Sequence, residues 1–192
     1  GPLSEIPAAA QVAMDGFTGC KTAAAEELPE AVAVMDPFHV VRLAGDAVER
    51  CRRRVQLDTL GHRGRKEDPL YKARRTLLTG ADLLTDKQYS RIQDVFDGDD
   101  HTEVEATWAF YQHLVAAYRE QDRAEGKKMM QKVITKLSRA VPKALTELTT
   151  LGRTLKDRAG DILAYFDRPG TSNGPTEAIC ESGSGWSGTG RS

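Results

Sequence analysis

Two short apolar runs, each followed by an aspartate, are the feature that most constrains the fold of this 192-residue chain. Residues 11–14 (QVAM) precede Asp15, and residues 31–35 (AVAVM) precede Asp36. Each run is too short for a helix and is followed by turn-forming residues, which is typical of a buried strand. The Ala-rich segment 17–28 between them predicts a helix that stops at a proline. Strand, helix and strand in this order predict an α/β unit whose parallel strands are buried on both faces.

From residue 37 onward the pattern is helical. Apolar residues recur at intervals of three and four, and no stretch alternates as a strand does. Residues 167–174 are turn-forming, Pro175 opens a short helix, and residues 181–192, with four Gly and four Ser, form a flexible tail. The expected fold class is therefore mostly α with a small α/β part. Helices are expected at residues 37–60, 69–80, 86–97, 101–121, 123–140 and 142–166.

Composition excludes several classes of protein. No apolar run approaches the ~20 residues of a membrane helix. The first residues carry no basic region followed by an apolar block, so no secretory signal is expected. The cysteines Cys20, Cys51 and Cys180 lie far apart, which argues against a disulfide scaffold or a cysteine zinc site and fits a reducing cytoplasm.

A basic segment at residues 42–75 is concealed by the net charge of −1. The segment holds eleven Lys or Arg and five Asp or Glu, a local net charge of +6. A patch of this kind can meet nucleic-acid phosphates, and a solvated helical face is the alternative. A neutral total charge argues against strong non-specific binding of nucleic acid by the whole chain.

Three acidic residues and one histidine could carry chemistry, and each also has a structural interpretation. Asp15 follows the first strand, where a carboxylate faces a ligand crevice; an ordinary Asp-Gly turn is the alternative. Asp36 and His39 form an Asp-x-x-His pair that could hold a metal or orient a carboxylate, but the spacing by itself favours a helix cap at Asp36 with His39 packed in the first turn. Glu177 lies near a helix N-terminus, where its charge is favourable without any catalysis.

Carboxylates that converge would matter chemically. Cleavage and transfer of phosphodiester strands use two divalent ions about 3.5–4 Å apart, which stabilise the attacking and leaving oxygens. Magnesium prefers oxygen ligands and binds through a few carboxylates. A complete site of this kind needs more acidic groups than Asp15 and Glu177 supply.

Several stretches, in order along the chain, resemble a known family. VAMDGFTGCKTAAAEELPEAVAVMDPFHVVRL is followed by LGHRGRKEDPLYKARRTLL, HTEVEATWAFYQ and LGRTLKDRAGDILAYFDRPGTSNGPTEAI. In order and spacing these stretches are similar to the DDE transposases of ISL-three insertion sequences, of the actinobacterial type. The resemblance covers about residues 10–179.

The resemblance implies a ribonuclease-H-like core that binds Mg²⁺ (or Mn²⁺) through an Asp, Asp, Glu triad and cleaves and joins DNA strands. The second Asp of the triad matches Asp15, and the final Glu matches Glu177. The signature that supports the site matches Asp36 and His39, and Asp36 remains an alternative triad member. The expected parts are a loose segment 1–10, a partial core at 11–41, a helical insertion at 42–166, a return to the core at 167–180 and the tail at 181–192.

Two departures from the family pattern affect the expected activity. The family's first Asp and its zinc-binding and helix-turn-helix regions belong upstream of Asp15, and this sequence does not contain them. After Glu177 the family continues into a basic helix, whereas here a Gly/Ser-rich tail follows. We therefore expect a fragment of the catalytic domain that is inactive alone. The alternative is a non-catalytic DNA-binding or regulatory helical module from a decayed element.

The resemblance also implies partners. Transposon-end DNA and target DNA are expected, with a homodimer as an option and no membrane, in the bacterial cytoplasm at the nucleoid. Trp108 could stack on an unpaired base, although its spacing to Val104, Tyr111 and Val115 fits core packing. The candidate DNA contacts of the basic segment are Arg50, Arg52, Arg53, Arg54, Arg63, Arg65 and Lys66.

Overall fold

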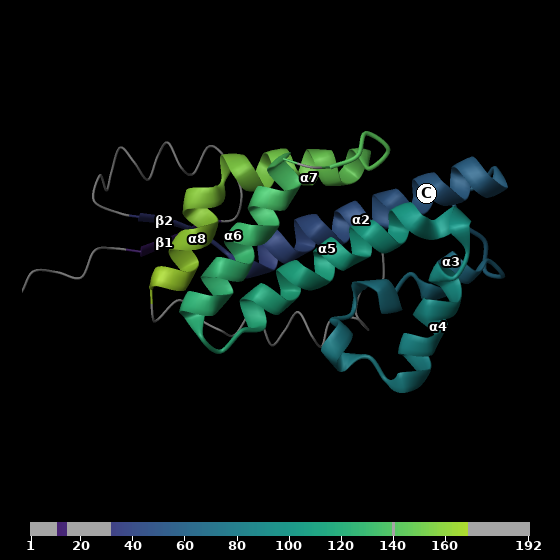
Figure 1. Cartoon of the computed structure of the whole chain (residues 1–192), viewed down its shortest axis with the longest axis horizontal. Coiled ribbons are helices and arrows are strands. Elements are labelled where there is room, and N and C mark those ends of the chain that lie inside the picture. The colour runs from purple at the N-terminus through teal and green to yellow at the C-terminus, as the bar shows by residue number, and fades with distance from the viewer. Residues whose placement is uncertain (1–10, 15–31, 140, 169–192) are drawn as a thin grey trace, which may run out of the picture.

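The structure, a computed structural model, describes residues 11–14, 32–139 and 141–168. These residues are mostly helical, with a small sheet at one end of the molecule (Figure 1). The expected class, mostly α with a small α/β part, is confirmed at this level. The helix expected between the two strands, the loose first segment and the Gly/Ser-rich tail all lie outside the described residues.

The small sheet has two parallel strands, β1 (Gln11–Met14) and β2 (Val32–Met35). Both strands are where the sequence predicts them. Their pairing is in register, so that Met14, the last residue of β1, lies opposite Met35, the last residue of β2. Because the strands are parallel, their carboxyl ends meet at one edge of the sheet.

Helix α2 (Pro37–Leu60) begins directly after β2, with Asp36 as the single residue between them. Oδ1 of Asp36 accepts a hydrogen bond from the backbone N–H of Phe38 at 2.9 Å, which satisfies one of the free donors of the first turn. Proline suits the first helical position because its missing N–H is not needed there. The helix ends at Gly61, whose φ of 71° allows the left-handed turn that closes it. The helix predicted at 37–60 is confirmed.

The remaining helices fall into two groups along the chain. Short elements come first: α3 (Pro69–Ala73), the 3-10 turns η1 (Thr76–Leu78) and η2 (Ala81–Leu83), α4 (Asp86–Phe96) and the 3-10 turn η3 (Asp99–His101). Four further helices follow: α5 (Thr102–Arg119), α6 (Arg123–Arg139), α7 (Thr146–Asp157) and α8 (Ala159–Asp167). The expected boundary between core and insertion, after residue 41, falls inside the continuous helix α2 and stays a prediction.

Two of the predicted helices are wrong in extent. The one expected at 69–80 ends with α3 at Ala73 and is followed by η1, where tighter i→i+3 hydrogen bonds replace those of an α-helix. The one expected at 142–166 starts only at Thr146 and breaks at Arg158, whose φ of −108° and ψ of 11° lie outside the helical region. The apolar spacing continues across this break, since both α7 and α8 bury their apolar residues, so the pattern does not reveal it.

Helix α2 runs along the long axis of the molecule with α5 beside it, and α6 packs on both α5 and α7 (Figure 1). Helix α8 packs on β2 and so connects the helices to the sheet. Two glycines lie where the backbones of neighbouring helices come close together. A Cβ on Gly126 would lie 2.6 Å from the carbonyl oxygen of Ala117, and one on Gly152 would lie 2.6 Å from that of Leu137. The backbone of α6 therefore contacts both of its neighbours directly.

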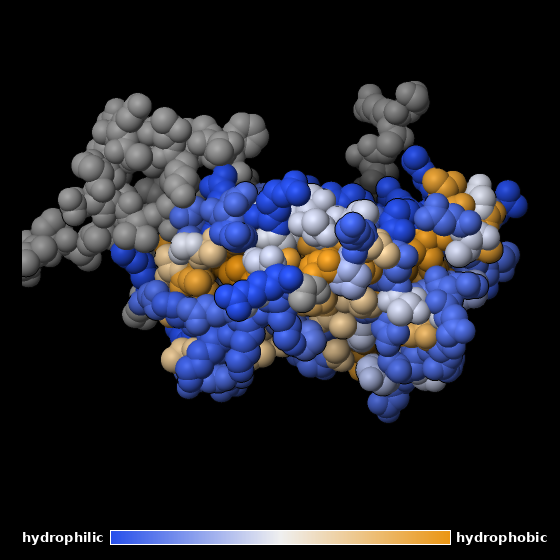
Figure 2. Space-filling view, turned by 45° about the horizontal axis from the view of Figure 1, so that its top comes forward, coloured by the Kyte–Doolittle hydropathy of each residue, from blue (hydrophilic) through white to orange (hydrophobic). Residues whose placement is uncertain are grey.

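The surface is not uniformly hydrophilic. On the face in Figure 2, apolar and weakly polar residues form a lengthwise band between hydrophilic margins. None of the helices in the described ranges is both long and apolar enough to cross a membrane. Large exposed hydrophobic side chains of the described part are Phe38, Leu57, Leu60, Leu78, Leu83 and Tyr89.

The contact between α6 and α7 yields a stability prediction. Gly152→Ala would place a methyl group against the backbone at Leu137, and overpacking of this kind costs about 1–3 kcal/mol. We expect the free energy of unfolding, measured by urea denaturation followed by circular dichroism, to fall by that amount. Gly160→Ala is the matched control, because nothing lies within 4 Å of a Cβ there. Equal effects of the two substitutions would contradict the close contact.

Candidate functional site

The carboxyl edge of the sheet is where the sequence predicts chemistry. Asp36 lies at this edge as the residue after β2, and it is partly buried. Its carboxylate caps α2, so the structural interpretation of Asp36 is confirmed. His39, partly buried, lies in the first turn of the same helix. Asp15 and Glu177, the proposed metal ligands, lie outside the described residues.

The chemistry of a divalent metal can be tested against this edge. Among the residues that the structure describes, no group of three or more His, Cys, Asp or Glu is placed to hold a metal ion. Asp36 by itself fits as one oxygen donor, because capping engages Oδ1 and a carboxylate has a second oxygen. A hard carboxylate oxygen is the ligand type that magnesium selects. Asp36 could therefore contribute to a site that needs further ligands from elsewhere.

An aromatic cluster lies close to this edge. Tyr118 of α5 stacks on Phe166 at 5.4 Å between ring centroids and meets Tyr165 edge to face at 5.4 Å, both from α8. Tyr118 is 5% exposed, and its hydroxyl has no hydrogen-bond partner among the residues that the structure describes. Burial raises the pKa of Tyr118 well above its usual range, and the negative charge of Asp36 adds to the effect.

Arg52, a candidate DNA contact, lies inside the molecule. It is 2% exposed, and its guanidinium donates to Glu49 at 2.7 and 2.8 Å and also to Gln56. The ring of Tyr71 lies 5.7 Å from the guanidinium carbon. Arg53 also binds Glu49, at 2.8 Å, but its side chain is 56% exposed. The contacts of Arg52 satisfy its charge within the fold.

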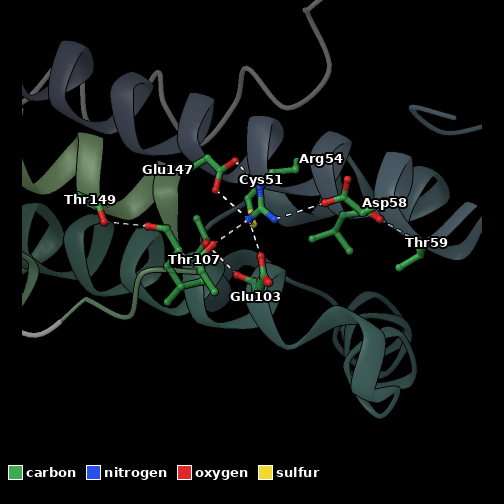
Figure 3. A network of polar contacts seen from close by, with 11 residues as sticks. Cys51, Arg54, Asp58, Thr59, Glu103, Thr107, Glu147 and Thr149 are labelled. Carbon is green, nitrogen blue, oxygen red and sulfur yellow. Dashed lines mark hydrogen bonds and ion pairs between the residues drawn. The ribbon is translucent and has the colours of Figure 1, made fainter. Parts of the chain in front are cut away.

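Arg54 lies at the centre of a network that joins three helices (Figure 3). It binds Glu147 of α7 with two hydrogen bonds of 2.9 and 3.0 Å, and it also binds Glu103 of α5. Asp58, one turn further along α2, lies 3.7 Å from the guanidinium. Beneath the network, the fully buried Cys51 has its Sγ 3.9 Å from Nη2 of Arg54. No local sequence pattern reveals this network, because Glu103 and Glu147 are 49 and 93 residues from Arg54.

Charges in the network shift one another's ionisation. Burial favours the neutral form of Glu147, but the hydrogen bonds and charge of Arg54 outweigh it, so the pKa of Glu147 is lowered. Burial is likewise outweighed at Glu49, whose pKa is lowered by Arg52 and Arg53. Hydrogen bonding to Glu147 is the main cause that raises the pKa of Arg54. These groups stay ionised at neutral pH; Arg54 thereby holds α2 against α5 and α7, whereas the ion pairs of Glu49 lie within α2.

The other basic candidates lie on the surface. Arg50 is exposed on α2, and Arg63, Arg65 and Lys66 are exposed in the turn between α2 and α3. In this turn Gly64 has a φ of 111°, a backbone conformation that residues with a side chain rarely adopt. The basic segment therefore divides into arginines used within the fold and cations that face solvent.

Trp108 packs mainly against the core. Its ring centroid lies 5.5 Å from that of Phe96, and its buried Nε1 has no hydrogen-bond partner in the part of the chain that the structure describes. The core-packing interpretation is thereby supported, although one side of Trp108 lines an open groove of about 720 Å³ together with Tyr89, Gln112 and Arg119. Stacking of Trp108 on a base stays a prediction.

Comparison with known proteins identifies the family of the chain. The model of the ISL-three family of DDE transposases, described as "Transposase", matches residues 5–182, which is nearly the whole chain. No curated protein and no solved structure matches it. The chain belongs to this transposase family. The family resemblance of the sequence motifs is therefore confirmed.

The Arg54 network yields a second prediction. Arg54→Met would leave Glu103 and Glu147 facing each other without their shared cation. Hydrogen bonds to charged groups contribute about 1.5–3 kcal/mol, so we expect the free energy of unfolding at pH 7 to fall by that amount. Arg53→Met is the matched control, because the 56% exposed Arg53 side chain makes a surface pair worth less than about 1 kcal/mol.

The difference in stability between the wild type and Arg54→Met should also depend on pH. The pKa of Glu147 is lowered in the folded state below its ordinary value of 4.5, so its ion pair stabilises the fold above that pH and is lost as the pH falls through the folded value. The stability difference between the wild type and Arg54→Met should therefore shrink below pH 4.5. A difference that is constant from pH 7 to pH 3 would argue that packing, not charge, is lost.

Tyr118 provides a third prediction. Its hydroxyl is buried, with no partner in the described ranges of the chain, and a buried polar group in that state costs about 1–3 kcal/mol. Tyr118→Phe removes the hydroxyl while keeping the ring contacts with Tyr165 and Phe166. We expect thermal unfolding of the variant at the same temperature as the wild type or higher. A clearly lower temperature would mean that the hydroxyl has a partner in solution.

Proposed function

We propose that this chain carries part of the catalytic centre of an insertion-sequence transposase, which cleaves and transfers DNA strands with divalent metal ions. The observation that carries the proposal is the in-register end of the parallel sheet, where Met14 lies opposite Met35. In the sequence, each of these residues is followed by an aspartate, Asp15 and Asp36. Neighbouring strand ends of this kind bring carboxylates to one ligand-binding edge.

The proposed roles follow from this edge and from the family match. Asp15 and Glu177 are metal ligands, while Asp36 and His39 support the site. When bound, Mg²⁺ or Mn²⁺ stabilises negative charge on the attacking and leaving oxygens of the phosphodiester. Asp36 is suited to its supporting role because its position is fixed by the cap of α2. The strands would then be part of a ribonuclease-H-like core, and the helices from residue 42 to residue 166 its insertion.

DNA contacts are proposed for the solvent-facing cations of the basic segment. Arg63, Arg65 and Lys66 are exposed in one turn, where lysine and arginine can reach phosphate oxygens. Arg50 and Arg53 are exposed on α2, which precedes this turn. Arg52 and Arg54 are left out of this proposal, because acidic partners within the fold hold their guanidinium groups. The DNA would be transposon ends and target DNA, bound by one copy of the chain or by two.

The experiment is a titration of the 192-residue chain with Mn²⁺, followed by electron paramagnetic resonance. Loss of an outer-shell partner lowers metal affinity roughly 10–100-fold, which we expect for Asp36→Asn and His39→Gln. Asp15→Asn and Glu177→Gln remove proposed ligands, so their affinity should fall further. Asp94→Asn, on the exposed side of α4, is the matched control and should bind Mn²⁺ as the wild type does.

The outcomes separate two functions. Absence of a Mn²⁺ site, or a site that Asp15→Asn and Glu177→Gln leave unchanged, would overturn the proposal. DNA binding without such a site would favour the alternative, a non-catalytic DNA-binding or regulatory module. That module would still need the exposed cations, because phosphate contacts supply most non-specific affinity.

A further inference from the structure

Helix α6 has two opposite faces of different character. Its inner face is buried against α5 and α7 and consists of Gly126, Met130, Val133, Ile134 and Leu137. These positions recur at intervals of three and four, so the residues between them face away from the core. The outer face carries Lys128, Lys132, Lys136 and Arg139, all of them exposed. This set of four is called the α6 basic face.

The α6 basic face forms a row. Lys128, Lys132 and Lys136 are spaced four residues apart, and Arg139 extends the row by three. At 1.5 Å of rise per residue, the row is about 16 Å long. Between the lysines, Gln131 and Thr135 are exposed as well. The three lysines, Gln131 and Thr135 together line a shallow hollow of about 380 Å³.

Three cations of this face have no acidic partner in the described part of the chain. No ion pair involves Lys132, Lys136 or Arg139 there. Lys128 binds Glu125 at 3.0 Å, with both side chains largely exposed, and a pair of that kind contributes little. This contrasts with Arg52 and Arg54 of α2, whose guanidinium groups are held by glutamates.

The other cations of α6 have structural partners. Arg123 donates to the carbonyl of Tyr165 at 3.1 Å and lies over the Tyr165 ring. Lys127 binds Asp167 of α8 at 2.6 Å. Both residues therefore fasten α6 to α8. The α6 basic face has no such role within the described fold, so its charge is available to a partner.

We propose that the α6 basic face binds the sugar–phosphate backbone of duplex DNA, as a contact surface separate from the turn at residues 63–66. This rests on the proposed function, in which the chain acts on DNA. The row is longer than the ~12 Å width of the major groove, so its two ends can reach phosphates of both strands. Glutamine and threonine between lysines suit phosphate oxygens, since such side chains are common backbone contacts.

The test is the salt dependence of DNA binding by the full 192-residue chain. The probe is a fluorescent duplex of arbitrary sequence, followed by anisotropy without divalent cations. Each phosphate contact contributes about 0.9 to the slope of log affinity against log salt. The double substitution Lys132→Gln with Lys136→Gln should therefore reduce the slope by about 2. Lys87→Gln, an exposed lysine of α4, is the matched control and should leave the slope unchanged.

Each outcome decides the matter. A slope unchanged by the double substitution overturns the α6 surface, and so does an equal change in the Lys87→Gln control. Failure of the unaltered chain to bind the duplex overturns it too. Failure of the proposed catalytic centre is seen separately in the Mn²⁺ titration, because Asp15 and Glu177 are not part of the α6 basic face. A Lys132→Arg with Lys136→Arg variant, which keeps the charge, should retain the wild-type slope.

Discussion

The direct passage from β2 into α2 is the constraint on which the rest of the structure depends. A single residue, Asp36, separates the last strand residue from Pro37. No loop can absorb a change of direction at this point, so the sheet and the longest helix are fixed relative to each other. The cap at Asp36 and the rigid φ of proline make this junction stiff. The first turn of α2 is therefore held at the carboxyl edge of the sheet, beside any site built there.

The second half of α2 is joined to α5 and α7 by ion pairs. Arg54 reaches both Glu103 of α5 and Glu147 of α7, so that one guanidinium joins three helices. An arginine serves this purpose because its planar fork can meet two carboxylates at once. Closer to the sheet, the ring of Tyr118 on α5 contacts the rings of Tyr165 and Phe166 on α8. Ion pairs thus join α5 and α7 to α2 at one end, and aromatic contacts join α5 to α8 at the other.

The sequence predicted those parts of the fold that local patterns encode. The runs ending at Met14 and Met35 identified both strands, and Pro37 identified the start of α2. The break at Arg158 was missed because it changes backbone angles without interrupting the apolar spacing. Of the candidate site, the cap at Asp36 could be predicted from one residue and its neighbour. The roles of Asp15 and Glu177 rest on the aligned strand ends and on the family match, and they stay predictions.

The number of cations in a sequence segment does not show how many of them are available to bind a partner. Counting residues identified 42–75 as the basic segment, yet in that segment Arg52 and Arg54 neutralise glutamates inside the fold. The glutamate bound by Arg52 is three residues away, whereas one bound by Arg54 is 93 residues away. A count of charges within a short sequence segment therefore misses the distant partner. On α6, by contrast, Lys132, Lys136 and Arg139 face away from the core, and no ion pair in the described part of the chain involves them. Available charge depends on the tertiary partners of each cation, and for a protein that binds phosphates this quantity, not the local count, sets the interface.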